Sequence, residues 1–313
     1  NINLFSDAIS RLAYEVWGLE IPTLALAIFA SVCMTVTTIV GFKAINILAM
    51  LMVPVLAFVT FLFIKSSLQT QSLGEILAAE RVASITTGEG ISAIVGAIII
   101  GAIILPDITR FVRHWSGAIY SAVIAYLVVQ LAVMGAAALA GSVSGKTDIL
   151  DIMLDLNLGL GAFLIVIGSS WVLNSLNLYS AILGTKATFP KLNSTWLAIA
   201  LGAVGVIAAL MNLLDNFIPF LIFLSDIFIP VAGVIIIDAL VIRRKDYHID
   251  TLTGNRSFNW PGLLAWAIGA AFALMISHSL IFSPTDITSI DAIVMAGLTY
   301  LTLSWIARKR KTV

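Results

Sequence analysis

The sequence predicts an all-α membrane protein, a polytopic bundle of helices, and two observations lead to this prediction. About nine apolar runs fill the chain almost from end to end. Each is long enough to cross a bilayer, because hydrocarbon about 30 Å thick requires about 20 apolar residues in a helix. The chain is also 60% hydrophobic and only 11% charged, whereas a soluble domain has about 25% charged residues. Such a chain has too few charged groups to cover a surface in water.

We expect the membrane spans at residues 21–42, 44–65, 90–109, 116–140, 158–184, 193–213, 216–240, 260–281 and 288–307. They should be helices, because backbone groups in lipid must bond within their own segment, and the short alternating segments of a β-barrel are missing from the sequence. Residues 1–18 are expected to be the tail of an earlier helix followed by a turn. Residues 70–85 are expected to form a short amphipathic helix on the outer surface. No linker interrupts the pattern, so we expect one transmembrane domain over residues 1–313.

The distribution of basic residues predicts the orientation of this bundle in the membrane. If successive spans alternate in direction, 13 of the 17 Lys and Arg residues fall on one side, namely Lys43, Arg110, Arg113, Lys186, Lys191, Arg243, Arg244, Lys245, Arg256, Arg308, Lys309, Arg310 and Lys311. The positive-inside rule makes that side cytoplasmic. We therefore expect a multi-pass protein of the cell membrane with a cytoplasmic C-terminus. The net charge is zero, and nothing indicates nucleic acid as a partner.

Catalytic and metal-binding patterns are missing from the sequence. HExxH, GxSxG and Walker-type motifs do not occur, and the three His residues are scattered. The single cysteine, Cys33, excludes an internal disulfide and any CxxC site. We therefore expect neither an enzyme nor a bound metal or prosthetic group. The first residues show no signal peptide, and we expect the chain to be a fragment that lacks its amino-terminal part.

The third span carries two glycines, Gly96 and Gly101, followed by Pro106. Glycine eases bending and lets a ligand approach the backbone, and proline removes a backbone donor. One interpretation is tight helix packing, with an ion pair between Asp107 and Arg110 three residues apart. The other is a discontinuous helix whose opened backbone faces a substrate.

The fifth span carries three polar side chains on one helical face: Ser170, Asn174 and Asn177. Two carboxamides offer both donors and acceptors, which suits a neutral heterocycle with lactam and amine edges. Polar contacts between helices are the alternative explanation.

The seventh span places Asp226 deep in the membrane, four residues before Pro230. A carboxyl group in such surroundings is a candidate for proton exchange, and a structural hydrogen bond is the alternative. Asp238, near the cytoplasmic end, is expected to pair with Arg243 or Arg244.

Three stretches give the chain a family resemblance. They are Pro106 to Phe111, Trp171 to Asn174 with Leu178 to Ser180, and Asp215 to Ile236 followed by Arg243, Arg244 and Lys245. In these stretches the chain resembles the nucleobase–cation symporter-1 family, the purine–cytosine permeases. The resemblance implies a transporter fold of two inverted five-helix repeats, with residues 90–240 as the complete second repeat, residues 260–307 as two carboxy-terminal spans, and the first helices lacking.

The resemblance also implies site residues. The segment from Gly96 through Ala97, Ile98, Ile100 and Gly101 matches a bent helix that contacts the base, and Asn174 matches a polar position facing the pocket. Ser169 matches a position that gives a backbone oxygen to sodium. The hydroxyl pair of a sodium site falls on Val172 and Leu173, which cannot coordinate a hard cation. Of the two co-transported ions that the family suggests, Na+ and H+, we therefore favour H+, with Asp226 as the proton-linked group.

These observations predict a secondary active transporter that imports a nucleobase such as cytosine or a purine by cation symport and alternating access, with Gly101 and Pro106 as hinges. Its partners would be a small heterocyclic substrate and the lipid bilayer. Allantoin, hydantoin and a vitamin-precursor pyrimidine are alternative substrates. A non-transporting remnant and an intramembrane enzyme are the alternatives of another class.

Overall fold

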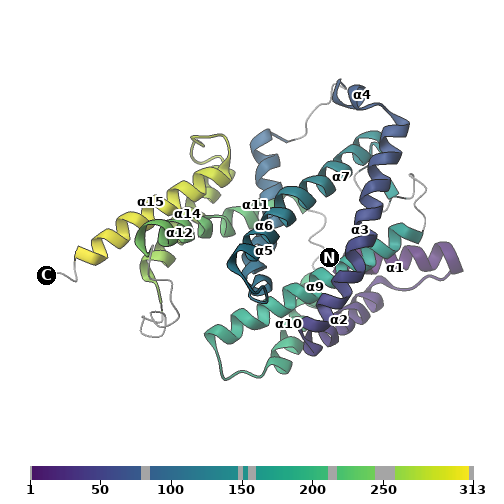
Figure 1. Ribbon diagram of the computed structural model, residues 1–313, viewed down its shortest axis with the longest axis horizontal. Coiled ribbons are helices and arrows are strands. Elements are labelled where there is room, and N and C mark those ends of the chain that lie inside the picture. The colour runs from purple at the N-terminus through teal and green to yellow at the C-terminus, as the bar shows by residue number, and fades with distance from the viewer. Residues whose placement is uncertain are drawn as a thin grey trace. The chain divides into compact units, whose positions relative to one another are not determined.

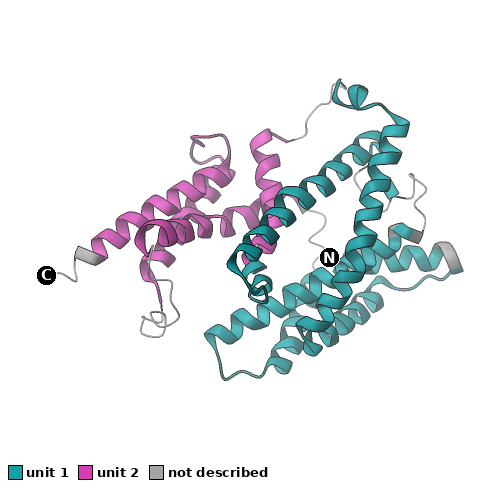
Figure 2. Cartoon of the chain, in the orientation of Figure 1, with its two compact units in different colours: residues 1–81, 104–212 teal, residues 82–103, 213–313 magenta. Residues whose placement is uncertain are grey.

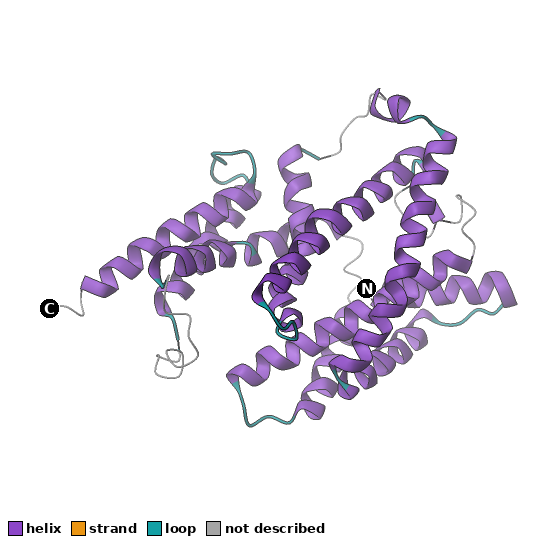
Figure 3. Cartoon of the chain, in the orientation of Figure 1, coloured by secondary structure: helices purple, strands orange, loops and turns teal. Residues whose placement is uncertain are grey.

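The computed structural model describes residues 2–78, 85–146, 151–153, 160–210, 217–243 and 258–309. In these ranges the chain consists of helices joined by turns, with no strand (Figures 1 and 3). The all-helical fold expected from the apolar runs is therefore confirmed.

Each expected span is found as a helix or as consecutive helical segments. Within the described residues, eight of these segments are long and apolar enough to cross a membrane, and α10 is a shorter apolar helix. The bounds are α1 Ile2–Trp17, α2 Thr23–Val40, α3 Phe42–Thr70, α4 Leu73–Ala78, α5 Thr87–Thr109, α6 Trp115–Val123, α7 Gln130–Ser144, α9 Leu160–Thr188, α10 Ser194–Leu210, α11 Phe217–Phe228, α12 Pro230–Ile237, α14 Trp260–Ser277 and α15 Thr288–Lys309. Two π-helical segments, Ile124–Val129 after α6 and Asp238–Ile242 after α12, continue those spans.

Some expectations lie outside the described residues. These concern the segment 79–84 and the basic residues Arg244, Lys245, Arg256, Arg310 and Lys311. The expected amphipathic helix at 70–85 is present as α4 in its described part.

Local sequence explains several helix starts. Ser72 and Glu75 form a capping box at the start of α4, in which the Ser72 N–H donates to Glu75 Oε2 at 2.8 Å and the Glu75 N–H donates to Ser72 Oγ at 3.3 Å. The Ser72 backbone N–H is the main reason that the pKa of Glu75 lies below its usual value. Thr86 and Glu89 form the same reciprocal pair before α5. Gly41, at φ +101°, makes the turn between α2 and α3, a conformation that side chains disfavour.

The chain divides into two compact units, which Figure 2 colours separately. Unit 1 contains residues 1–81 and 104–212, and unit 2 contains residues 82–103 and 213–313. The single domain expected from the sequence stays a prediction.

In unit 1, α9 is the central helix and packs against α1, α2, α3 and α10. Two hydrogen bonds join it to α2: Trp171 Nε1 donates to Thr37 Oγ1 at 3.0 Å, and Thr38 Oγ1 donates to the Ser175 carbonyl at 3.2 Å. The apolar core around α3, α7 and α9 includes Phe63, Met153 and Phe163. Polar residues of α9 are thereby held between several helices.

In unit 2, α12 and α14 pack against α15 through small residues. A Cβ atom built on Gly233 would overlap the Ile293 carbonyl oxygen, and one built on Gly269 would lie 2.7 Å from the Ala296 Cβ. Small residues let membrane helices approach closely and gain dispersion contacts. These contacts are important for helix association, because lipid offers no hydrophobic driving force between helices.

The helix break lies in the seventh span, whereas a discontinuous third span was one of the two interpretations of the sequence. Helix α5 is continuous through Gly96, Gly101 and Pro106, whereas the seventh span stops at Phe228 and restarts at Pro230. In α5, Gly96 is used for close packing, because a Cβ there would overlap the Leu221 carbonyl of α11. In the seventh span, Pro230 lacks the N–H that an unbroken helix would donate to the Asp226 carbonyl. Trp266 of α14 compensates at this break by donating its indole N–H to the Ile227 carbonyl at 2.8 Å.

Candidate functional site

Asn174 and Asn177 line one cavity of about 290 Å³ inside unit 1. Helix α2 contributes Ser31, Met34 and Thr35 to its wall, and α10 contributes residues from Leu201 to Ala208. The Asn174 amide nitrogen donates to the Ser170 carbonyl at 2.9 Å, which fixes the orientation of that carboxamide. Within the described structure, Asn177 Oδ1 and Ser31 Oγ are buried without a hydrogen-bond partner. The two carboxamides predicted from the sequence therefore meet in one apolar cavity that has a few polar groups.

Ser170 lines a different cavity from the two asparagines. It is 6% exposed and belongs to a cavity of about 250 Å³ between α3, α7 and α9, beside Val133, Met153 and Val166. The three polar residues share a helical face by spacing, but this face is wide enough to reach two cavities. Ser170 thus meets Asn174 through its backbone carbonyl, and its side chain faces other neighbours.

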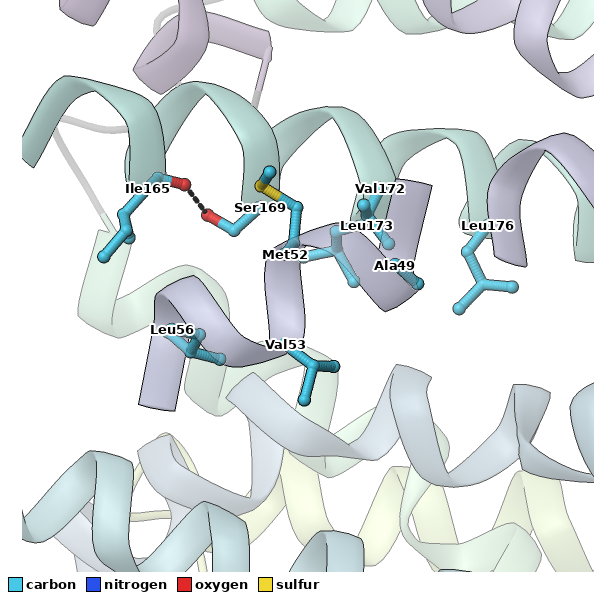
Figure 4. Close-up of a pocket in the computed structure, with 9 residues that line it drawn as sticks. All are labelled: Ala49, Met52, Val53, Leu56, Ile165, Ser169, Val172, Leu173 and Leu176. Carbon is cyan, nitrogen blue, oxygen red and sulfur yellow. Dashed lines mark hydrogen bonds between the residues drawn. The ribbon is translucent and has the colours of Figure 1, made fainter. Parts of the chain in front are cut away.

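Ser169 lies at a third cavity, of about 180 Å³, between α3 and α9 (Figure 4). Its wall is otherwise apolar, with Val172 and Leu173 from α9 and Met52, Val53 and Leu56 among the residues from α3. The Ser169 hydroxyl donates back to the Ile165 carbonyl at 2.5 Å (Figure 4). This wall offers few oxygen ligands, and a hard cation prefers several.

The segment from Gly96 to Ala102 lies in unit 2. Gly96 touches the backbone of α11. Ile99 belongs to a core with Ile229, Ala273 and Ala292, and Ile100 packs at its edge. Within unit 2 this segment therefore contributes to helix packing, and the base-contacting role of Gly96, Ala97, Ile98, Ile100 and Gly101 stays a prediction.

Asp226 is 1% exposed and lies in the interior of unit 2. Its Oδ2 accepts a hydrogen bond from Ser277 Oγ at 2.6 Å, and its Oδ1 has no partner among the described residues. The neighbouring Ser225 does not share this bond, because its hydroxyl pairs with Ser289, which in turn donates to Ser92 at 3.2 Å. Asp226 is therefore a buried carboxyl group with a single hydroxyl partner.

The ion pair between Asp107 and Arg110, part of one interpretation of the third span, is not formed in the described structure. The Arg110 guanidinium donates to Tyr179 Oη at 2.5 Å and lies 4.8 Å from the centre of the Phe111 ring. Phe42, the first residue of α3, stacks on Phe111 with ring centres 4.2 Å apart. Aromatic faces attract a guanidinium, so Arg110 links the end of α5 to the start of α3 and to Tyr179 within α9.

The expected pairing of Asp238 is confirmed, since Arg243 Nε lies 3.6 Å from its Oδ1. Tyr300 also donates to the same oxygen at 2.5 Å, and Asn259 donates to Tyr300. In the described part of the chain, no three His, Cys, Asp or Glu side chains cluster as metal ligands do.

Sequence reasoning missed several residues of these sites. Ser31 and Thr35 carried a usable signal, because they lie four residues apart on one face of an otherwise apolar run. No pattern in the sequence indicates Ser277 or Trp266, because their roles depend on which turn of α14 lies beside the break in the seventh span.

A membrane-embedded helical bundle with a proline-broken span and with cavities lined by carboxamides defines a class of protein: a solute transporter. Discontinuous spans and polar groups within the bundle are recurring features of secondary transporters.

Comparison with known proteins identifies the family within this class. The profile of the family described as "Permease for cytosine/purines, uracil, thiamine, allantoin" matches residues 3–301. Cytosine permeases of Escherichia coli K12 and of Escherichia coli O157:H7 are 31% identical to the chain over 304 residues, covering 94% of this chain and 68% of theirs. The chain therefore belongs to the nucleobase–cation symporter-1 family of transporters, as its motifs predicted.

Solved structures agree on the fold. Mhp1, a nucleobase-cation-symport-1 family transporter, in a closed conformation with bromovinylhydantoin bound, matches with a TM-score of 0.77 at 20% identity, over 98% of this chain and 72% of Mhp1. The inward-facing conformation of Mhp1 matches with a TM-score of 0.71 at 18% identity, over 98% of this chain and 71% of Mhp1. The transporter fold expected from the sequence is confirmed.

Proposed function

We propose that this protein imports a nucleobase such as cytosine, or a purine, across the cell membrane by cation symport with alternating access. The observation that carries the proposal is the cavity that Asn174 and Asn177 share within a chain of this family. A carboxamide donates through its nitrogen and accepts through its oxygen, so it matches the adjacent amine and lactam groups of a nucleobase. The 31% identity to cytosine permeases supports the same substrate class.

Proton coupling is the cation chemistry that the site favours. The cavity at Ser169 presents Val172 and Leu173 where hydroxyls would hold sodium, and the Ser169 hydroxyl is bonded to its own helix. If this proposal is correct, replacing external Na+ with choline leaves uptake unchanged, whereas abolishing the pH gradient reduces it. Uptake that requires Na+ at constant pH would contradict it.

Alternating access needs positions at which a span bends. We propose Gly101 and Pro106 as hinges of α5, because glycine and proline lower the resistance of a helix to bending. The break at Ile229 between α11 and α12 is a further hinge of the same kind.

The function is tested with the full chain reconstituted in proteoliposomes. Uptake of radiolabelled cytosine is measured with an inward proton gradient, and unlabelled adenine, uracil, allantoin and hydantoin are added as competitors. We expect either uptake of the labelled cytosine or competition for its binding by the purine adenine. Allantoin or hydantoin is the second candidate substrate, which the hydantoin bound to the structural relative favours. The absence of uptake and of binding for all these compounds would contradict the proposal.

The role of Asn174 is tested by Asn174→Ala, which removes a hydrogen-bonding group from the cavity wall. We expect the Kd for substrate to rise about 5- to 10-fold, because a polar contact is worth about 1–1.5 kcal/mol net. Binding is measured by tryptophan fluorescence or by scintillation proximity. The matched control is Asn46→Ala, since Asn46 is exposed on α3 and its amide reaches only Met50 Sδ at 3.4 Å. An equal loss in both variants would exclude a specific role for Asn174.

A further inference from the structure

We propose that Asp226 and Ser277 form a proton-loading site: Asp226 holds the proton, and Ser277 passes it between Asp226 and the surface of unit 2. This inference rests on the proposed function for its link to transport, but the proton site itself stands on the geometry of unit 2.

Burial and hydrogen bonding of Asp226 fit the protonated form of its carboxyl group. The residue is 1% exposed, and a single hydroxyl at 2.6 Å is its partner in the described structure. An ionised carboxylate needs donors for both oxygens and is costly to bury without them. A neutral acid needs less, because its carbonyl oxygen Oδ1 carries little charge. In that form the direction of the 2.6 Å bond is reversed, and the O–H group at Oδ2 donates to Ser277 Oγ. Burial of Oδ1 without a hydrogen-bond partner among the described residues is therefore compatible with a neutral carboxylic acid and not with an ionised carboxylate.

Ser277 connects this buried group to the surface. It is the last residue of α14, and both Ser277 and the following His278 are exposed. A hydroxyl both donates and accepts, so it can relay a proton. On loading, a surface water gives a proton to Ser277 Oγ, and Ser277 passes its own hydroxyl proton to the Asp226 carboxylate. The water becomes hydroxide, or a hydronium ion becomes water, and the serine is unchanged.

The other titratable groups that the structure describes on the neighbouring helices of unit 2 have partners of their own. His278, directly after α14, lies within electrostatic reach of Asp226. On α15, Asp291 accepts bonds from Ser283 Oγ at 2.5 Å and from the Thr285 N–H at 3.4 Å. On α5, Glu89 is held in its capping box. After α12, Asp238 is bonded to Tyr300 and Arg243. Each of these acids has polar partners that suit a carboxylate, and Asp226 differs from them.

The position of Asp226 links proton binding to a movable part of the chain. Pro230 leaves the Asp226 carbonyl without its helical donor, and the span restarts one turn beyond the carboxyl group. A change in the packing of α11 against α14 would separate Asp226 from Ser277 and expose it. Proton loading would then depend on the conformation of this break, which is what coupling requires.

The protonation of Asp226 is tested first, by a measurement that needs no transport assay. Infrared difference spectra of the full chain in lipid, recorded between two pH values, detect the C=O stretch of a protonated carboxyl group. We expect such a band at neutral pH in the unmodified protein and its loss in Asp226→Asn. If the band is absent, or if it persists in Asp226→Asn, the proposal is overturned. Because the readout needs no substrate, it is independent of the proposed function.

Coupling is tested next in proteoliposomes with a pH-sensitive dye inside. We expect Asp226→Asn to bind substrate but to lose both gradient-driven uptake and substrate-dependent acidification of the lumen. We expect Ser277→Ala to slow proton entry several-fold and to keep the coupling. The matched control, Ser225→Ala, alters the adjacent buried hydroxyl that bonds Ser289 and not Asp226, and its pH profile should be unchanged. Proton-coupled uptake by Asp226→Asn would overturn the proposal and leave the proposed function intact. If no heterocycle is taken up but the infrared band is present, the proposed function fails and the proton site stands.

Discussion

Trp266 shows at the scale of one residue how a proline in a membrane helix is tolerated. Pro230 interrupts the backbone bonding of its span, and lipid supplies no water to satisfy freed carbonyls. The indole of Trp266 donates to the Ile227 carbonyl at 2.8 Å, directly at the break. A side chain of a neighbouring helix thus replaces a backbone donor.

Trp266→Phe is therefore expected to lower the free energy of unfolding by about 1–3 kcal/mol, because it leaves a carbonyl without a donor. Thermal unfolding of the purified protein in detergent measures the loss. Trp115→Phe serves as the control, since the Trp115 side chain is 79% exposed. Equal melting temperatures for the two variants would rule out a structural role for the indole bond.

At the scale of elements, helix contacts in this chain depend on small residues and on one aromatic cluster. Gly96 brings α5 against the backbone of α11, and Gly233 brings α12 against α15. Arg110, Phe111, Phe42 and Tyr179 join α3, α5 and α9 in unit 1. These contacts determine which helices are neighbours. The hydropathy of the sequence predicts only that the segments are membrane helices.

Gly96→Ala is expected to destabilise the protein by about 1–3 kcal/mol, because the added methyl group would overlap the Leu221 carbonyl and the helices would have to separate. Gly135→Ala in α7 is the matched control, since a Cβ there meets nothing within 4 Å, and the better helix propensity of alanine should leave stability equal or higher. Chemical unfolding in mixed micelles compares them. A Gly96→Ala variant as stable as the control would refute the close contact.

The contact between Arg110 and Tyr179 is measured by a double-mutant cycle with Arg110→Ala, Tyr179→Phe and the pair. We expect a coupling free energy of about 0.5–1.5 kcal/mol, the size of one hydrogen bond, because phenylalanine keeps the ring of Tyr179 and removes only its hydroxyl. Strictly additive effects would show that the hydroxyl of Tyr179 and the guanidinium do not stabilise each other.

At the scale of the whole molecule, the distribution of basic residues predicts how the bundle lies in the membrane. Lys191, in the turn between α9 and α10, belongs to the predicted cytoplasmic side, and Pro284, in the turn between α14 and α15, belongs to the outer side. Both turns are described and exposed, so the prediction is open to chemical labelling.

In a Cys33→Ala background, Lys191→Cys should react with a membrane-impermeant maleimide only after the cells are opened. Pro284→Cys should react in intact cells. The reversed pattern would invert the predicted topology, and with it the side from which Ser277 would load a proton.

The sequence by itself determined the helical spans, their order, the family and the polar positions within the spans, because a bilayer demands long apolar helices and makes every polar residue in them conspicuous. It did not determine which way those side chains face. Lipid and a packed interior are both apolar, so hydropathy does not distinguish the two sides of a membrane helix. Only the tertiary structure placed Asn174 and Asn177 in one cavity, separated Ser170 from them, decided between a continuous and a broken α5, located the break at Pro230, and brought Ser277 to Asp226.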